Sequence, residues 1–186
     1  MHRGDVDFRG ERRANETHAS TTDPEALLAR KGPGREAKLC FAGHVLMDNR
    51  NGLVVDVQIT QATGTAERDT ALEMLQAVPG SRRLTVGADK GYDTKDFVRE
   101  CRDMDITPHV ARKQRSAIDM RTARHEGYWV SQRIRKRVEE VFGWMKTVAG
   151  ARKLRYCGVE RNQLWAEVTL AGYNLVRLAK LVEAPA

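Results

Sequence analysis

Apolar and polar side chains alternate most clearly over two neighbouring segments in the first half of the chain. Large apolar residues fall mainly at alternate positions from Leu39 to Met47 and again from Leu53 to Ile59, which is the pattern of half-buried strands. Between them, Asp48–Gly52 is rich in Asn and Gly, residues that accept the positive φ of tight turns. The pattern therefore predicts a β-hairpin.

Further along the chain, helical and strand patterns alternate. The predicted helices cover about Thr65–Ala77, Thr94–Met104, Val130–Val148 and Gln163–Val182, and the predicted short strands cover Leu84–Ala88 and Ile106–Val110. Pro108 removes a backbone donor, which suits a strand at the edge of a sheet. From Ala111 to Tyr128 no periodic apolar pattern survives, so this segment is predicted to be a long loop. The alternation predicts the α/β class, with helices layered on a sheet.

Residues 1–37 are predicted to be a poorly ordered lead-in to a folded domain at residues 38–183. The lead-in has few large apolar side chains and contains a Gly-Pro-Gly sequence at residues 32–34. Within it, Asp23–Ala29 predicts a short helix, because Asp23 can serve as the N-cap and Pro24 suits the first helical position.

The composition excludes several classes of protein. With 186 residues, of which 41% are hydrophobic, the chain can build one core, which argues against intrinsic disorder and a second full domain. It has neither an apolar run that could span a membrane nor the apolar stretch of a signal peptide. Cys40, Cys101 and Cys157 are odd in number and widely spaced, so neither a disulfide framework nor a zinc site is expected. We therefore expect a cytoplasmic protein without a membrane partner.

Positive charge is concentrated in one part of the chain. The chain has 32 Lys and Arg against 25 Asp and Glu, a net charge of +7. The segment Ala111–Arg137 alone holds nine basic and two acidic residues, so the rest of the chain is close to neutral. A local block of this kind points to a polyanion such as nucleic acid. A solvated helix face is the alternative interpretation.

Asp89 is the first candidate for chemistry. It follows the predicted buried strand Leu84–Ala88, and the ligands of open α/β sheets gather at the carboxyl ends of strands. Gly87 and Gly91, on either side, would let a backbone or a phosphate come close. The alternative is an ordinary Asp that caps the junction between a strand and a helix.

Glu139 is the second candidate. On a continuous helix Arg135 lies at i−4 from it and Lys146 at i+7, so the three side chains share one face. Phe142 on this face predicts partial burial of the carboxylate, which suits a metal ligand or part of a phosphate site. A surface ladder of ion pairs is the alternative, and Glu140 is the competing carboxylate.

The spacing of Arg135, Glu139 and Lys146 resembles the Arg-Glu-Lys part of the Tyr-Arg-Glu-Lys signature of bacterial insertion-sequence DDE transposases. The residues between Arg135 and Lys146 are typical of one subgroup of that family, and Gly87–Asp93 resembles the region of the family's second Asp. Further resemblance to the subgroup lies in Ser20–Ala26 and Gly64–Arg68. The similarity covers nearly the whole chain.

This resemblance implies an RNase H-like fold, in which helices flank a mixed sheet. It also implies that two Asp and one Glu hold two divalent cations, normally Mg²⁺, for in-line attack on a DNA phosphodiester. By this resemblance Asp89 is the second Asp and Glu139 is the Glu, each a metal ligand and a candidate catalytic group. The implied partners are terminal inverted repeats and target DNA.

By the same resemblance, the basic side chains of the signature would contact DNA phosphates. Arg135 would make forked contacts and Lys146 would act as a point charge. Other DNA-binding candidates lie beside the two carboxylates in the sequence: Lys90, Arg133, Lys136 and Arg137.

Two features depart from the family pattern. Gln132 stands at the position of the signature's Tyr, and no Asp ends an apolar strand before the predicted hairpin, where the family's first Asp is expected. We therefore expect the C-terminal part of a catalytic domain, lacking the first strand of its sheet and inactive without an upstream segment. A second copy of the chain or a full-length transposase is the expected protein partner.

Three hypotheses follow. The chain is a catalytic domain that acts together with its upstream part; or it is a DNA-binding remnant that inhibits full-length copies by mixed assembly. The third hypothesis is a decayed reading frame, whose product folds poorly because its sheet lacks a central strand.

Overall fold

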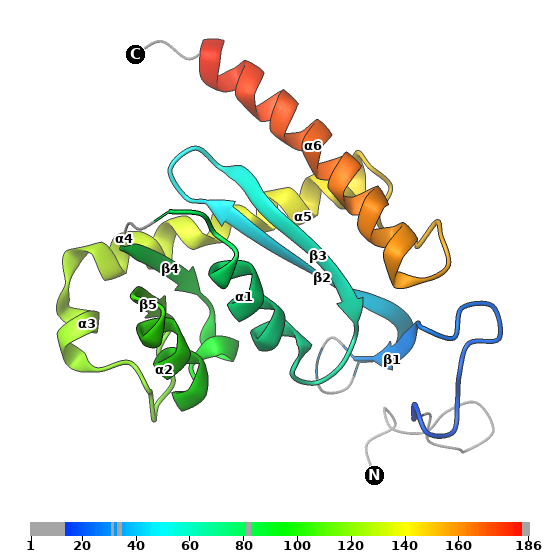
Figure 1. Cartoon of the computed structure of the whole chain (residues 1–186), viewed down its shortest axis with the longest axis horizontal. Coiled ribbons are helices and arrows are strands. Elements are labelled where there is room, and N and C mark those ends of the chain that lie inside the picture. The colour runs from blue at the N-terminus through cyan, green and yellow to red at the C-terminus, as the bar shows by residue number, and fades with distance from the viewer. Residues whose placement is uncertain (1–13, 31, 33–34, 81–82, 184–186) are drawn as a thin grey trace.

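The computed structural model describes residues 14–30, 32, 35–80 and 83–183 (Figure 1). The strands are β1 (Leu27–Ala29), β2 (Lys38–Asp48), β3 (Leu53–Gln61), β4 (Leu84–Ala88) and β5 (Ile106–Val110). The helices are α1 (Ala66–Gln76), α2 (Lys95–Asp103), α3 (Met120–Arg124), α4 (Glu126–Ile134), α5 (Val138–Thr147) and α6 (Val159–Glu183). Single 3₁₀ turns, η2 (Lys90–Tyr92) and η3 (Arg135–Arg137), precede α2 and α5. The predicted α/β class is confirmed.

The described strands form two sheets, where one mixed sheet was expected. Strands β1, β2 and β3 are antiparallel in that order, and β4 and β5 form a parallel pair. The predicted hairpin is confirmed, with Val45 of β2 opposite Val57 of β3. Within the described residues β5 pairs on one side alone, as Pro108 suggested.

The hairpin turn follows from its Asp, Asn and Gly residues. The carboxylate of Asp48 accepts hydrogen bonds from the backbone N–H groups of Arg50 (3.0 Å) and Asn51 (3.1 Å). Gly52 has a φ of +72°, a conformation that costs a glycine little. The predicted turn is thus confirmed.

The helix predicted at Asp23–Ala29 is wrong. The end of this segment forms β1, in which Leu27 pairs with Cys40 of β2. The Asp23 carboxylate instead accepts a hydrogen bond from the backbone N–H of Gly158 (3.1 Å), next to the start of α6. These partners lie far away in the sequence, and they outweigh the weak local preference for a short helix. Strand β1 lies inside the predicted lead-in, while residues 1–13, 31, 33 and 34 lie outside the described residues.

The long loop predicted from Ala111 to Tyr128 is also wrong in part, because it contains α3 and the start of α4. The Asp119 carboxylate accepts from the Thr122 N–H (2.7 Å), and Nδ1 of His125 accepts from the Gly127 N–H (3.1 Å). Such caps satisfy the first N–H groups of a helix. These helices are short, so a few buried side chains suffice and no periodic apolar pattern develops.

The helix predicted at Val130–Val148 is divided in the structure. It begins earlier, as α4, and η3 separates α4 from α5. The C-terminal helix predicted at Gln163–Val182 is confirmed as α6, with a start at Val159. No helix in the described ranges is long and apolar enough to cross a membrane.

Two clusters of buried side chains hold the molecule together. One joins α1, α2, β5 and α4 around Phe97, Cys101 and Val110. The other joins the hairpin to α5 and α6 around Val141 and Leu170. We call these parts the β4–β5 half and the hairpin half.

Helix α6 runs alongside the hairpin (Figure 1) and hydrogen-bonds to strand β3 through side-chain amides. Asn174 accepts from the Val54 N–H and donates to the Val54 carbonyl, both at 2.8 Å. Gln163 accepts from the Ile59 N–H (2.7 Å) and donates to the Val57 carbonyl (2.8 Å). We call Gln163 and Asn174 the amide clamp. It satisfies backbone groups that a neighbouring strand would otherwise pair, and it covers this edge of the sheet.

Candidate active site

Asp89 lies at the carboxyl end of β4, where the backbone turns away from the sheet. Its Oδ1 accepts a hydrogen bond of 2.6 Å from the backbone N–H of Gly91, so Asp89 caps the 3₁₀ turn η2. The capping alternative is therefore observed. The side chain is nevertheless exposed, and a carboxylate has more acceptor sites than this one bond uses. Capping leaves Asp89 able to bind a further group.

Asp93, four residues further on, is a residue that the sequence analysis missed. It is buried, and it accepts hydrogen bonds from the backbone N–H groups of Lys113 (2.7 Å) and Ala117 (2.8 Å). Burial raises the pKa of Asp93, but hydrogen bonds from Lys113, Ser116 and Ala117 and the charge of Lys113 outweigh it and lower the pKa. Asp93 thereby fastens the start of the basic segment to the loop after β4.

Arg135 packs directly on strand β4. A Cβ added to Gly87 would lie 3.3 Å from Arg135 Cβ and 3.4 Å from the Ser131 carbonyl oxygen, so the glycine permits this close approach. Gln132, which replaces the signature's Tyr, donates to the His109 carbonyl of β5 and accepts from Arg135 Nε (3.0 Å). The signature segment therefore crosses the β4–β5 pair next to the strand that ends at Asp89.

Glu139 lies in the first turn of α5 and is exposed, so the predicted partial burial is wrong. The buried stripe of α5 contains Val141, which is two residues further along and points to the opposite side of the helix. Glu140 is exposed as well. Because η3 interrupts the helix, Arg135 and Glu139 stand on separate helical segments.

One comparison with known proteins gives the family of the chain. The model of the transposase DDE domain matches residues 15–175. The chain belongs to the DDE transposase family. Comparisons with curated proteins and with solved structures found no match. The resemblance to insertion-sequence DDE transposases is thereby confirmed, and the family implies DNA as the substrate.

The cations of the transposase domain differ in how they are used. Arg137 donates to the backbone carbonyls of Asn49 (2.9 Å) and Arg50 (3.3 Å), so it ties η3 to the hairpin turn. The other DNA-binding candidates of the described chain, apart from Arg135, are exposed and take part in no ion pair there: Lys90, Arg133, Lys136 and Lys146.

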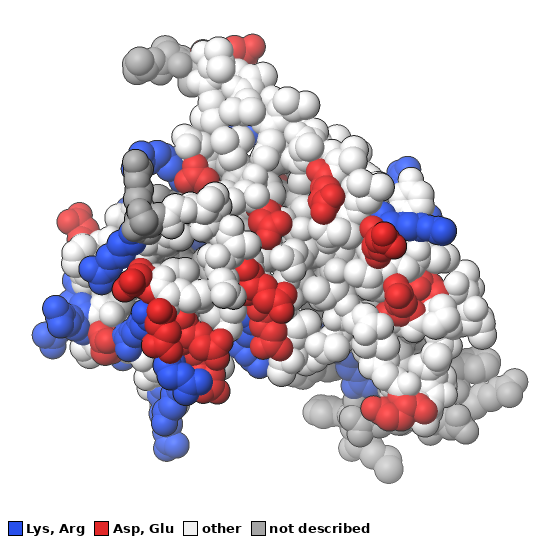
Figure 2. All heavy atoms as spheres, in the orientation of Figure 1, with Lys and Arg blue, Asp and Glu red and all other residues white. Residues whose placement is uncertain are grey.

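Charge is unevenly distributed over the surface of the transposase. On the face drawn in Figure 2, acidic side chains gather over α1 and α2, and many of the basic side chains lie over the α3 side. On that side, a hollow of about 350 Å³ is lined by residues that include Arg112, Met120 and Trp129. The Trp129 side chain is 64% exposed. The same hollow is lined by Ala111, whose backbone N–H donates to the carbonyl of Ala88, the residue before Asp89.

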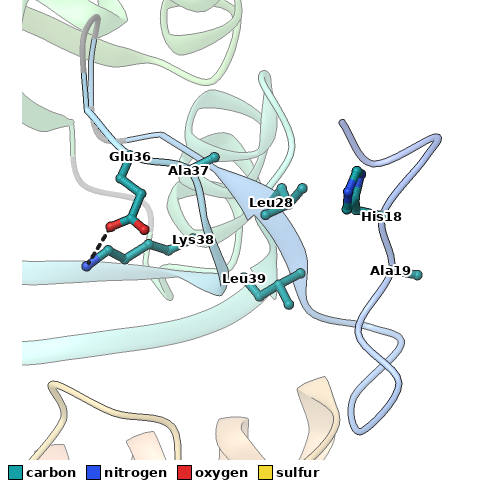
Figure 3. A pocket seen from close by; sticks show the side chains of 7 residues that line it. All are labelled: His18, Ala19, Leu28, Glu36, Ala37, Lys38 and Leu39. Atoms are coloured by element: carbon teal, nitrogen blue, oxygen red, sulfur yellow. Dashed lines mark ion pairs between the residues drawn. The ribbon is translucent and has the colours of Figure 1, made fainter. Parts of the chain in front are cut away.

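A second hollow, of about 550 Å³, lies between the segment around His18 and strands β1 and β2 (Figure 3). Glu36 and Lys38 form an ion pair of 3.6 Å at its wall. None of its lining residues belongs to β4 or α5, so it is separate from the candidate active site.

Asp89 and Glu139 are of the chemical type that binds a divalent cation, but two carboxylates are fewer than the three that the family uses. Mg²⁺ prefers oxygen ligands, and Asp89 and Glu139 offer exposed carboxylate oxygens. In the described part of the chain, however, no three His, Cys, Asp or Glu residues form a group that could hold a metal ion. The assignment of Asp89 and Glu139 as metal ligands therefore stays a prediction.

Proposed function

We propose that the chain takes part in DNA transposition as a DDE transposase that cleaves and transfers DNA strands with the help of divalent cations. The observation that carries this proposal is the packing of Arg135 on Gly87 of β4. It lays the segment of the family signature across the strand that ends at Asp89. Asp89 and Glu139 are then two of the acidic groups of the active site.

The proposed fold is RNase H-like, with a further strand that would lie between β4 and the part of β2 after Cys40, which β1 does not pair, and would join the two sheets into one. Order along the chain supports it: a hairpin, a helix, a strand, a helix, a strand and then helices. Strand β4 pairs with β5 alone among the described strands. The third carboxylate is proposed to come from that additional strand, which an upstream segment or a partner molecule would supply.

The proposed roles divide between carboxylates and cations. Asp89 and Glu139 would hold Mg²⁺, which when bound activates the attacking oxygen and stabilises the leaving oxygen of the phosphodiester. The exposed cations Lys90, Lys136 and Lys146 would neutralise phosphates of the DNA backbone and so position the duplex. The Glu139 side chain is exposed, so a cation and DNA could reach it.

The test is strand transfer on terminal inverted repeats with a version of the chain extended upstream. We expect Glu139→Gln to reduce the rate by about two orders of magnitude or more, since a lost ligand costs more than a lost partner of a ligand. Glu140→Gln is the matched control, because it removes a neighbouring exposed carboxylate from the same helical turn. Equal activity of Glu139→Gln and the wild type would refute the assigned role.

A second candidate function is that of a DNA-binding inhibitor of full-length copies. Two observations favour it: the described residues contain no group of three side chains that could hold a metal ion, and several cations are exposed, among them Lys90, Lys136 and Lys146. Such a chain would bind DNA with an affinity that falls steeply with salt. It would also slow strand transfer when mixed with a full-length transposase. DNA binding that does not change with salt would exclude this function.

A further inference from the structure

The loop that joins α5 to α6 is fixed at the point where it leaves α5. Gly150 has a φ of +71°, a conformation that ends helices because a glycine adopts it at little cost. The backbone N–H of Ala151 donates to the Met145 carbonyl (2.9 Å), one of the carbonyls left open at the end of α5. The chain therefore leaves the helix in a defined conformation.

The loop is also fixed where it enters α6, by two carboxylates from the segment before β1. Asp23 accepts a hydrogen bond from the Gly158 N–H (3.1 Å). Glu25 accepts one from the Val159 N–H (2.6 Å). These N–H groups lie at the start of α6, where a helix has no backbone acceptors of its own for them. Both ends of the loop are thus held before any ligand arrives.

Between these anchors five successive side chains are exposed: Arg152, Lys153, Leu154, Arg155 and Tyr156. We call residues 152–156 the basic loop. In the part of the chain that the structure describes, its three cationic side chains and the Tyr156 hydroxyl take part in no hydrogen bond or ion pair. The sequence between Glu140 and Glu160 contains no acidic residue, so no neighbour along the chain neutralises the basic loop.

Helix α5 connects the basic loop with the candidate active site (Figure 1). Glu139 lies in its first turn and Lys146 in its last, and residues seven apart lie on the same face of a helix. From Glu139 to Thr147 the helix rises by about 12 Å. An exposed cation and then the basic loop therefore follow Glu139 along α5.

We propose that the basic loop binds the phosphate backbone of the DNA duplex whose phosphodiester lies at Asp89 and Glu139. This inference rests on the proposed function. Arg and Lys side chains and the hydroxyl of Tyr are common phosphate ligands in protein–DNA complexes, and a loop that is already fixed loses little entropy on binding. Because a duplex advances about 3.4 Å per base pair, a rise of about 12 Å places the loop roughly four base pairs or more from the bond that is cut.

The first experiment measures binding of the full chain to fluorescent DNA duplexes by anisotropy at several salt concentrations, without metal. One duplex carries a terminal inverted repeat, and the other has an unrelated sequence of equal length. The double variant Arg152→Gln/Lys153→Gln should bind both duplexes at least about tenfold more weakly at low salt, because phosphate contacts carry no sequence information. The slope of affinity against salt should fall by about 1.8, because each lost phosphate contact removes about 0.9.

The matched control is Lys95→Gln/Lys180→Gln, which removes two positive charges from exposed positions of α2 and α6. It should keep the wild-type slope, because these residues lie outside the basic loop and α5. Tyr156→Phe should weaken binding about threefold and leave the slope unchanged, since a neutral donor displaces no counterion. Arg155 is left in place, because its guanidinium lies against Gly150 and its loss would alter the loop.

Folding of each variant is checked by its thermal melt, since all the substituted side chains are exposed. Equal affinity of the basic-loop variant and the wild type overturns the proposal. A control variant that is weakened as much overturns it too, because total charge would then explain the effect. A wild-type chain that binds neither duplex at low salt overturns it as well.

The second experiment locates the DNA and separates its two sources, the end of the element and the target. Cys157 adjoins the basic loop and is exposed, whereas Cys101 is buried and burial raises the pKa of Cys40, so a thiol-directed photocrosslinker attaches next to the loop. We expect crosslinks about four to six base pairs from the cleaved bond, and none in Cys157→Ser. Crosslinks to the target duplex alone would assign the basic loop to target DNA. Crosslinks scattered along both duplexes, or their absence, contradict the proposal.

Failure of this proposal and failure of the proposed function give different results. Glu139→Gln should bind DNA without metal at least as tightly as the wild type, because it removes no cation, and it should lose strand transfer in the chain extended upstream. The basic-loop variant should transfer strands slowly at low DNA concentration and approach the wild-type rate at saturating DNA. Normal binding and transfer by the basic-loop variant, with transfer lost in Glu139→Gln, overturns the proposal for the loop alone.

Discussion

The amide clamp in the hairpin half and Asp89 in the β4–β5 half use their polar atoms in opposite ways. In the hairpin half, Gln163 and Asn174 use both the oxygen and the nitrogen of their side-chain amides in hydrogen bonds to the backbone of β3. In the β4–β5 half, one carboxylate oxygen of Asp89 accepts a hydrogen bond from the Gly91 N–H, and the side chain remains exposed. Fully used polar groups fix a scaffold, whereas partly used ones remain available to a ligand. The comparison separates side chains that hold shape from those proposed to act on DNA, and both halves contain both kinds: Asp93 fastens the loop after β4, and Glu139 lies exposed on α5.

The largest effect should come from removing a core side chain from one half. Phe97→Ala is expected to lower the free energy of unfolding by about 3–5 kcal/mol, because it leaves a cavity in the β4–β5 core. If the halves are partly independent, hydrogen exchange should accelerate more at the amides of β5 than at those of β3. Leu170→Ala, in the other core, should give the reverse order. Equal acceleration at both sites would show that the halves unfold as one unit.

The next effect tests the amide clamp. Asn174→Ala leaves the N–H and the carbonyl of Val54 without their partner, at a cost of about 2–3 kcal/mol in unfolding free energy. Urea unfolding measures this cost. Glu160→Ala, at an exposed position of the same helix, is the control and should change stability by less than about 0.5 kcal/mol. An Asn174→Ala chain as stable as the wild type would mean that water replaces the clamp.

A smaller effect, of about 1–2 kcal/mol at neutral pH, is expected for Asp93→Asn. The pKa of Asp93 is lowered from its ordinary value of 3.8, so its ionised form stabilises the folded state above that pH. This contribution is lost as the pH falls through the lowered pKa. Urea unfolding between neutral and acidic pH should therefore show less acid destabilisation in the variant. Asp96→Asn removes a carboxylate of an exposed ion pair with Arg99, and at neutral pH it should lower the free energy of unfolding by less than about 0.5 kcal/mol.

The smallest effect on stability is expected for the exposed cations. Lys136→Gln should leave the free energy of unfolding within about 0.5 kcal/mol and reduce the slope of DNA affinity against salt by about 0.9. Arg137→Gln is the informative partner, because Arg137 joins the two halves through the carbonyls of Asn49 and Arg50. It should lower stability by about 1 kcal/mol. If the two variants had the same free energy of unfolding, the hydrogen bonds of Arg137 to the hairpin turn would contribute nothing to stability.

Local patterns sufficed for much of the fold. The hairpin, β4, β5 and α2 follow from alternation, from turn residues and from the cap at Thr94, whose hydroxyl accepts from the Phe97 N–H. These signals lie within a few residues of the structure they determine. Strand β1 could not be predicted in this way, because its formation depends on pairing with Lys38–Cys40.

The residues of the candidate site were likewise predictable where their environment depends on neighbouring residues, and not where it depends on residues far away in the sequence. The position of Asp89 at the end of a strand was predictable from the neighbouring residues, and the structure places it there. The role of Asp93 was not, because its donors at Lys113 and Ala117 lie at least twenty residues away in the sequence. The exposure of Glu139 was missed because it depends on which side of α5 the hairpin covers.

The amide clamp also fixes the alignment of α6 along strand β3, because its two amides must reach positions a set distance apart on the strand. From Gln163 to Asn174 the helix makes about three turns and rises by roughly 16 Å, which is about the length of the five-residue step from Val54 to Ile59 in the strand. Inserting one residue between Gln163 and Asn174 would rotate one amide by about 100° relative to the other. Only one of the two could then remain on the strand. Single-residue insertions and deletions should therefore be tolerated after Arg177 far better than between the two amides.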